Sequence, residues 1–218
     1  MTFSTDAWSA IADIRGAIDE LPFLTRLADG SLDHEVFRHY LTQDALYLAD
    51  YGRVLAAAAS QSTDPDDLIF WAQSARTTVV VERELHAAHV ADLADLAGAT
   101  PSPTCRAYTA YLWSLAGGGC YPALVAGILP CFWIYDDVGR RMRERVGDPG
   151  GHAFGDWIAT YGDPEFAAST ARAREIVDRV AAESSPAVVA RMHEAFTTAE
   201  RYEWMLWDAP MRLEAWPV

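Results

Sequence analysis

A stretch without a single charged side chain runs from Ala107 to Tyr135, and it strongly constrains how this chain can fold. A segment of that length could cross a bilayer, which needs about 20 apolar residues. Three glycines at 117–119, followed by Pro122, interrupt the stretch near its middle, and neither half then spans comfortably. We therefore expect two buried helices in a water-soluble core and no membrane span.

The rest of the chain also has helical periodicity, without an alternating strand pattern of useful length. Asp64 and Pro65 suit an N-cap and a first helical position, so a helix is expected from there to Leu96. Other helices are expected at 33–55, from Pro101 or Pro103, from Pro122, near 163–183 and at 186–208. Because the connections are short, residues 1–218 are expected to form one all-α domain, a bundle of about seven or eight helices.

The composition is that of a folded acidic protein. Hydrophobic residues make up 51% of the 218 residues, which is enough for a substantial core. The formal net charge of −14 repels phosphate backbones, so we expect no nucleic-acid partner. The three cysteines form no C-x-x-C pair, and the N-terminal segment has no secretory signal pattern. Reduced thiols in a cytoplasmic protein are the simplest expectation.

One helix is expected to carry an acid among aromatic residues. Four side chains share a helix face through spacings of four, three and four residues: Tyr40, Asp44, Tyr47 and Tyr51. A charge on a core-facing stripe is costly without partners. Asp44 is therefore either half of a structural ion pair, for example with Arg53, or a ligand-facing acid ringed by tyrosines.

A second acid lies on the apolar face of the last helix. The spacing defines that face as Phe196, Ala199, Glu203 and Trp207. Glu200 is expected one turn before Glu203 and to one side. Desolvation would raise the pKa of Glu203 and suit it to acid–base chemistry, whereas the alternative is a core carboxylate satisfied by hydrogen bonds.

Cys131 follows a proline in the apolar sequence LPCFWIYDDVG, residues 129–139. Cysteine is often simply a buried core residue. Pro130, however, cannot donate to the carbonyl of Ala126, so the helix is expected to kink there. Tyr135 follows Cys131 by one helical turn on the same face. A thiol and a phenol at such a bend could form a pocket wall, with the thiol as nucleophile.

The histidines give little support to a metal site. His86 and His89 follow Glu82, but none of the six histidines has a glutamate three residues earlier, as two-iron helical bundles require. We therefore expect no metal and no cofactor, and we interpret Glu82 with His86 as a hydrogen-bonded pair. Haem ligation by one histidine stays open.

Five segments in order resemble the TenA family, also called thiaminase II. They are YLTQDALYLADYGR (40–53), AYTAYL (107–112), LPCFWIYDDVG (129–139), WIATY (157–161) and YEWMLWD (202–208). The resemblance covers nearly the whole chain and implies a haem-oxygenase-like fold without haem, usually as a homotetramer. It also implies hydrolysis of thiamin or of 4-amino-5-aminomethyl-2-methylpyrimidine to the hydroxymethylpyrimidine in thiamin salvage.

The resemblance further implies a set of site residues, all present here. It assigns pyrimidine binding to Asp44, Tyr47, Tyr108 and Tyr161, the nucleophile to Cys131, and supporting catalytic roles to Tyr135 and Glu203. The sequence departs from the family pattern at Ala209-Pro210-Met211, which puts the local packing in question but removes none of these residues.

Three other classes of function compete with this interpretation. A binding module would hold a pyrimidine without turning it over, and a haem-oxygenase-like oxidase would carry haem or two metals. A related enzyme of the same fold could act on another heteroaromatic amine. The sequence also leaves open whether thiamin or the aminopyrimidine is the better substrate.

Overall fold

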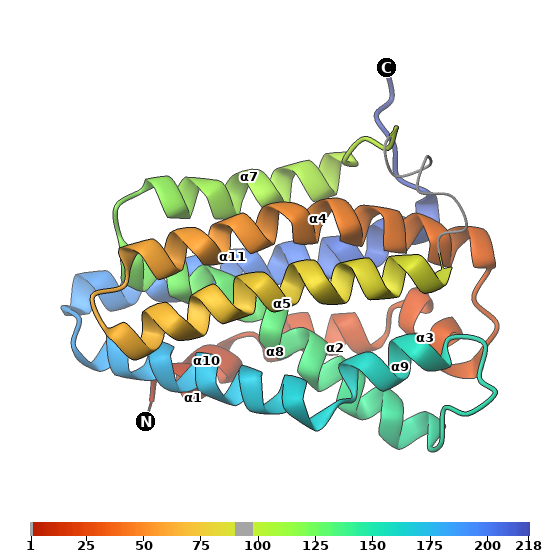
Figure 1. The fold of residues 1–218 in the computed structure, drawn as a ribbon, viewed down its shortest axis with the longest axis horizontal. Helices are drawn as coiled ribbons and strands as arrows, with labels where there is room; N and C mark the ends of the chain where they lie inside the picture. The colour runs from red at the N-terminus through yellow and green to blue at the C-terminus, as the bar shows by residue number, and fades with distance from the viewer. Residues whose placement is uncertain (1, 90–97) are drawn as a thin grey trace. The chain divides into compact units, whose positions relative to one another are not determined.

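The structure, a computed structural model, describes the backbone of residues 2–89 and 98–218 and the side chains of residues 2–80 and 98–218. Within these ranges every regular element is a helix (Figure 1), which confirms the expected all-α class. No helix of the described part is long and apolar enough to cross a membrane.

The chain divides into two compact units, each assembled from segments far apart in the sequence. Unit 1 consists of residues 1–32 and 122–207, and unit 2 of residues 33–121 and 208–218. The expectation that residues 1–218 form one domain remains a prediction.

Unit 2 is organised around one long helix. Its elements are α4 (His34–Gln61), α5 (Pro65–His89), α7 (Pro103–Gly117) and the 3₁₀ helix η1 (Ala209–Arg212). Helix α4 packs along α5 and α7, and also contacts η1 (Figure 1). The predicted continuation of α5 to Leu96 lies outside the described residues.

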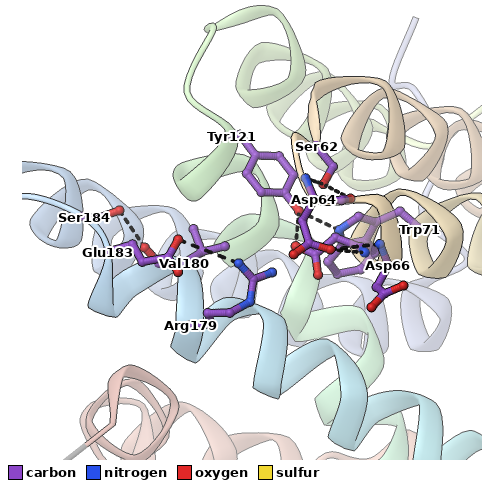
Figure 2. Close-up of polar contacts among 10 residues, drawn as sticks. Ser62, Asp64, Asp66, Trp71, Tyr121, Arg179, Val180, Glu183 and Ser184 are labelled. Carbon is purple, nitrogen blue, oxygen red and sulfur yellow. Dashed lines mark hydrogen bonds and ion pairs between the residues drawn. The ribbon is translucent and has the colours of Figure 1, made fainter.

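The start of α5 is held by side chains, as the sequence predicted (Figure 2). The carboxylate of Asp64 accepts from the backbone N–H groups of Asp66 at 2.8 Å and Asp67 at 3.2 Å. Further along, Trp71 Nε1 donates to the hydroxyl oxygen of Tyr121 at 2.9 Å, and that hydroxyl donates to Asp67 at 3.2 Å. These bonds satisfy polar groups that burial would otherwise leave costly.

The charge-free stretch divides where the glycines predicted. Helix α7 ends at Gly117, and Gly119 has a φ of 65°, a left-handed conformation that glycine adopts without strain. The next helix begins two residues later, at Tyr121. The sequence therefore correctly predicted two helices here instead of one long span. The prediction that both are buried was wrong for α7, since Trp113 on its outer face is 40% exposed.

Unit 1 contains the remaining helices. They are α1 (Phe3–Ala10), α2 (Ala12–Asp19), α3 (Pro22–Asp29), α8 (Tyr121–Val146), α9 (Gly155–Tyr161), α10 (Pro164–Ala182) and α11 (Pro186–Asp208). The three short N-terminal helices and α9 were not predicted from the sequence. Helix α8 continues through Pro130, and every residue from 123 to 135 on it is buried.

Gly139 permits a close approach between α8 and α9. A Cβ atom at position 139 would overlap the backbone carbonyl group of Tyr161. Because glycine has no Cβ, the end of α9 can lie against α8, and the rings of Tyr161 and Tyr135 come within 4.8 Å between centroids. A backbone requirement in one helix thus places an aromatic side chain of another.

The C-terminal segment departs from the family pattern but is well ordered by contacts within unit 2. Ala209 and Pro210 are buried in η1. Beyond it, Glu214 accepts from the backbone N–H of Thr104 at 2.9 Å and from its hydroxyl at 3.0 Å, at the start of α7. Burial acts to raise the pKa of Glu214, but hydrogen bonds from Thr104 and Ser102 outweigh it and lower that pKa.

Replacing Gly139 with alanine should destabilise the protein. We expect Gly139→Ala to lower the free energy of unfolding by about 1–3 kcal/mol, since the new methyl group forces α8 and α9 apart. Urea denaturation measures the change. Gly16→Ala is the matched control, because its Cβ meets no described atom within 4 Å, and it should stabilise helix α2 by about 0.5–1 kcal/mol. Equal effects of the two substitutions would contradict the close approach.

The stabilisation by Glu214 should depend on pH. Because its pKa is lower in the folded state, the contribution is present above the unfolded value of about 4.3 and disappears as the pH falls through the folded value. Glu214→Gln should therefore lower the melting temperature at pH 7 more than at pH 3. The exposed Glu20→Gln is the control. A Glu214→Gln effect that stays constant with pH would refute the linkage.

Candidate active site

In unit 2, three buried tyrosines stack in a row. The ring of Tyr47 lies 5.4 Å from that of Tyr51 at an interplanar angle of 20°, and 4.9 Å from that of Tyr108 at 28°. Tyr47 and Tyr51 come from α4, and Tyr108 comes from α7, which packs against α4. Two of the predicted binding residues, Tyr47 and Tyr108, are therefore in direct contact.

Asp44 lies one helical turn before Tyr47 and is only 2% exposed. The ion pair considered for it does not involve Arg53, whose guanidinium pairs with Asp50 at 3.2 Å and is largely exposed. Asp44 and Tyr47 thus combine an acid and an aromatic surface on the same buried face of α4.

The charge of Asp44 acts on the thiol of Cys105. Cys105 is fully buried on α7, and its thiol donates to the backbone carbonyl of Gln43 at 3.6 Å. Burial, and next the nearby charge of Asp44, raise the pKa of the Cys105 thiol to about 12. A thiol of that kind is protonated at neutral pH and is a poor nucleophile.

In unit 1, Cys131 and Tyr135 occupy successive turns of α8. Cys131 is 8% exposed and Tyr135 is 2% exposed, and both lie after Pro130 within the apolar part of the helix. None of the three cysteines forms a disulfide. The kink expected at Pro130 remains a prediction, because the helix is continuous through this position.

An aromatic cluster surrounds Tyr135. Its ring lies 4.8 Å from Tyr161 and 4.7 Å from Trp207, while Trp157 lies 4.8 Å from Tyr161. Helices α8, α9 and α11 each contribute to the cluster. The sequence marked Tyr135 and Tyr161 as site residues, but it gave no signal for the supporting role of Trp157, which depends on α9 meeting α11.

Glu203 lies one turn before Trp207 on α11 and is fully buried. Glu200, expected to lie to one side, is buried just as completely. Burial and, after it, the charge of Glu203 raise the pKa of Glu200 well above its ordinary range. The expectation that Glu200 lies to one side was therefore wrong: it is four residues after Phe196 and three before Glu203, and it shares their buried face.

The proposed histidine pair cannot be placed, since the side chains of Glu82, His86 and His89 lie outside the described residues. Among the side chains that are described, no group of three or more histidine, cysteine, aspartate or glutamate residues could hold a metal ion.

Each unit, taken by itself, contains side chains with a distinct chemistry. Unit 2 offers a carboxylate beside stacked phenol rings, which suits a flat, polar heteroaromatic ring. Unit 1 offers a thiol, a phenol and two buried carboxyls on α8 and α11. A thiol can serve as a nucleophile, and a desolvated carboxyl can exchange protons near neutral pH.

Comparison with known proteins shows the family to which the chain belongs. The model described as the TENA/THI-4/PQQC family matches residues 8–213. The chain is 30% identical to the aminopyrimidine aminohydrolase of Bacillus subtilis (strain 168) over 221 residues, which covers 99% of this chain and 92% of that enzyme.

The chain is also 36% identical to the thiamine biosynthesis multifunctional protein ThiED of Corynebacterium glutamicum, over 94% of this chain. It spans only 28% of the length of that relative. The similarity therefore concerns one part of a longer protein.

Solved structures share the fold. A TenA homologue protein from P. horikoshii OT3 matches with a TM-score of 0.88 at 25% identity, covering 98% of this chain and 100% of the homologue. A domain from Shewanella denitrificans os217, described as having a heme oxygenase-like fold, matches with a TM-score of 0.72 at 15% identity. The expected haem-oxygenase-like fold is confirmed.

The state of the Cys105 thiol can be tested by alkylation. In the native protein at pH 8, iodoacetamide should label Cys105 roughly 100-fold or more slowly than the partly exposed Cys120, because the Cys105 thiol is buried and stays protonated. Peptide mass spectrometry measures both rates. In urea the two cysteines should react alike, and equal rates in the native protein would contradict the raised pKa.

Proposed function

This chain belongs to the TENA/THI-4/PQQC family, and we propose that it is an aminopyrimidine aminohydrolase. The observation that carries the proposal is its similarity to an enzyme of that name over nearly the full length of both chains. The proposed reaction converts 4-amino-5-aminomethyl-2-methylpyrimidine, or thiamin, into the hydroxymethylpyrimidine. It requires no metal or cofactor, and its place is the salvage of thiamin breakdown products.

Substrate binding is assigned to Asp44, Tyr47, Tyr108 and Tyr161. Asp44 accepts a hydrogen bond from the 4-amino group and fixes the orientation of the ring. Tyr47 and Tyr108 are already stacked against one another and offer rigid aromatic surface at little entropic cost. Tyr161 orients the leaving group or the attacking water.

The chemistry is assigned to Cys131, Glu203 and Tyr135. The Cys131 thiolate adds to the electron-poor ring carbon, and Glu203 donates a proton to the ring nitrogen that receives the electron pair. The bond from the exocyclic methylene to the leaving group then breaks, releasing ammonia or the thiazole. Water adds to that methylene, and the ring expels the thiolate. Tyr135, one turn from Cys131, orients the thiol throughout.

Several features support this proposal over the alternatives. A binding module would need only the aromatic and acidic residues, whereas unit 1 also contains a buried thiol and two buried carboxyls. A haem-oxygenase-like oxidase would bind haem or two metals, so a coloured or metal-loaded purified protein would favour it. Stoichiometric binding without product would favour the binding module, and turnover of a different heteroaromatic amine would favour a related enzyme.

The assembly and compartment are further parts of the proposal. We expect a homotetramer, and exposed apolar side chains on α5 and α7 offer surface for association: Leu68, Ile69, Val79, Val80 and Trp113. Cysteines without disulfides suit the reducing cytoplasm. Light scattering at micromolar concentration would show a monomer if the tetramer is wrong.

The proposed roles predict distinct losses of activity. Cys131→Ser and Glu203→Gln should each lower kcat for hydroxymethylpyrimidine formation by about 100-fold or more, since they remove the nucleophile and the proton donor. Product is measured by chromatography with thiamin and the aminopyrimidine in parallel. The compound that is hydrolysed faster is then the preferred substrate. Cys120→Ser is the matched control and should retain activity.

The outcomes separate the parts of the proposal. Wild-type turnover by Cys131→Ser would refute covalent catalysis while leaving hydrolysis intact. Absence of product from both substrates with the wild-type enzyme would refute the proposed function itself.

A further inference from the structure

A single buried glutamine fastens the start of α7 to α4. Gln43 lies on α4 directly before Asp44 and is 8% exposed. Its side-chain Oε1 accepts from the backbone N–H of Ser102 at 2.8 Å, and its Nε2 donates to the backbone carbonyl of Thr100 at 3.3 Å. Both ends of one amide group are thus bonded to the segment that leads into α7. The proposed reaction gives this glutamine no role.

The backbone of the same residue makes a third contact with α7. The thiol of Cys105 donates to the backbone carbonyl of Gln43 at 3.6 Å. In a regular α-helix this carbonyl also accepts from the N–H four residues later, which here belongs to Tyr47. The first turn of α7 is therefore bonded to the turn of α4 that begins at Gln43, ends at Tyr47 and contains Asp44.

The tyrosine stack lies one helical turn beyond these bonds on both helices. Tyr47 follows Gln43 by four residues, and Tyr108 follows Cys105 by three, so each pair shares one face of its helix. The rings of Tyr47 and Tyr108 lie 4.9 Å apart, and both are fully buried. Helices α4 and α7 lie side by side along this region (Figure 1). The bonds at Gln43 therefore fix the position of α7 at which the two rings meet.

The other hydrogen bonds at the start of α7 do not join it to α4. Glu214 accepts from the backbone and the hydroxyl of Thr104, and Trp216 Nε1 donates to the backbone carbonyl of Pro101 at 2.9 Å. These bonds attach the segment to the C-terminal part of unit 2. The side-chain cap on the first turn is a bond within α7 and the residue before it. They keep α7 folded, and its attachment to α4 is left to Gln43.

We propose that Gln43 is a positioning residue for substrate binding, which holds α7 against α4 so that the ring of Tyr108 stays stacked on Tyr47. A flat heteroaromatic ring binds most tightly to an aromatic surface that is already ordered, because ordering side chains on binding lowers the affinity. Without the glutamine amide, the buried N–H of Ser102 loses its acceptor, and α7 opens more readily at this end. The role rests on the proposed function, in which Asp44, Tyr47 and Tyr108 bind the pyrimidine.

Gln43→Met tests the role in binding. Methionine is close to glutamine in length and volume but cannot make the two amide bonds, while the Glu214 bonds and the helix cap remain. The variant should raise KM for the aminopyrimidine about tenfold or more and leave kcat within about twofold, since it disturbs the binding surface and not the reacting groups.

Gln61→Met is the matched control for this experiment. Gln61 is also a glutamine of α4, and its Nε2 donates to the backbone carbonyl of Ala116 at 2.9 Å, near the other end of α7. Its replacement should leave both kinetic constants unchanged. An unchanged KM in Gln43→Met, or an equal rise of KM in the two variants, would overturn the proposal.

Alkylation of Cys105 tests the attachment of α7 without using activity. Iodoacetamide should label this thiol about tenfold or more faster in native Gln43→Met than in the wild type, because opening at the start of α7 exposes it. Peptide mass spectrometry measures the rate. Gln61→Met should label at the wild-type rate, and equal acceleration in both variants would show a general loosening and overturn the positioning role.

A measurement on the wild type does not depend on a variant that folds. If opening at the start of α7 destroys the binding surface, bound hydroxymethylpyrimidine must suppress that opening. At about ten times its Kd, measured by calorimetry, the compound should slow labelling of Cys105 about tenfold and leave that of Cys120 unchanged. Labelling of Cys105 that is unaffected by the bound compound would overturn the positioning role. If the compound binds and protects Cys105 but neither substrate is hydrolysed, the proposed function fails and the positioning role stands.

Discussion

The enclosure of α8 is the physical constraint on which much of this molecule depends. Every residue from 123 to 135 is buried, which is compatible with the absence of charged side chains in that segment. Cys131 and Tyr135 are therefore buried because they belong to this segment of α8. Their burial needs no further explanation from the site itself. In such surroundings electrostatic effects are stronger than in water, and every polar group needs a partner or a function.

The same constraint explains why acidic groups matter so much here. Glu200 and Glu203 on α11 face an interior in which charge is costly, and Arg15 is held by its stack on Trp8. Burial raises the pKa of Glu200 and so favours its neutral form. In unit 2, by contrast, burial is accommodated by aromatic packing, with the rings of Tyr47 and Tyr108 stacked 4.9 Å apart.

A large part of the fold could be predicted because its signals are local. The cap at Asp64 and the break at 117–119 act through backbone conformation within a few residues, and both were predicted correctly. The burial of Asp44, Cys131 and Glu203 also followed from spacing along single helices. The assignment of these residues to a reaction came from the family resemblance and remains a proposal.

What the sequence determined by itself was the helical class, the positions of most helices and which of their faces are apolar, since these depend on neighbours three or four residues apart. Only the tertiary structure decided which helices meet. The approach at Gly139 that brings Tyr161 to Tyr135, the stack that holds Arg15, and the complete burial of Glu200 all join segments that are distant in the chain. Periodicity along one helix describes a face but not what covers it, and the pKa of a buried acid depends on that cover.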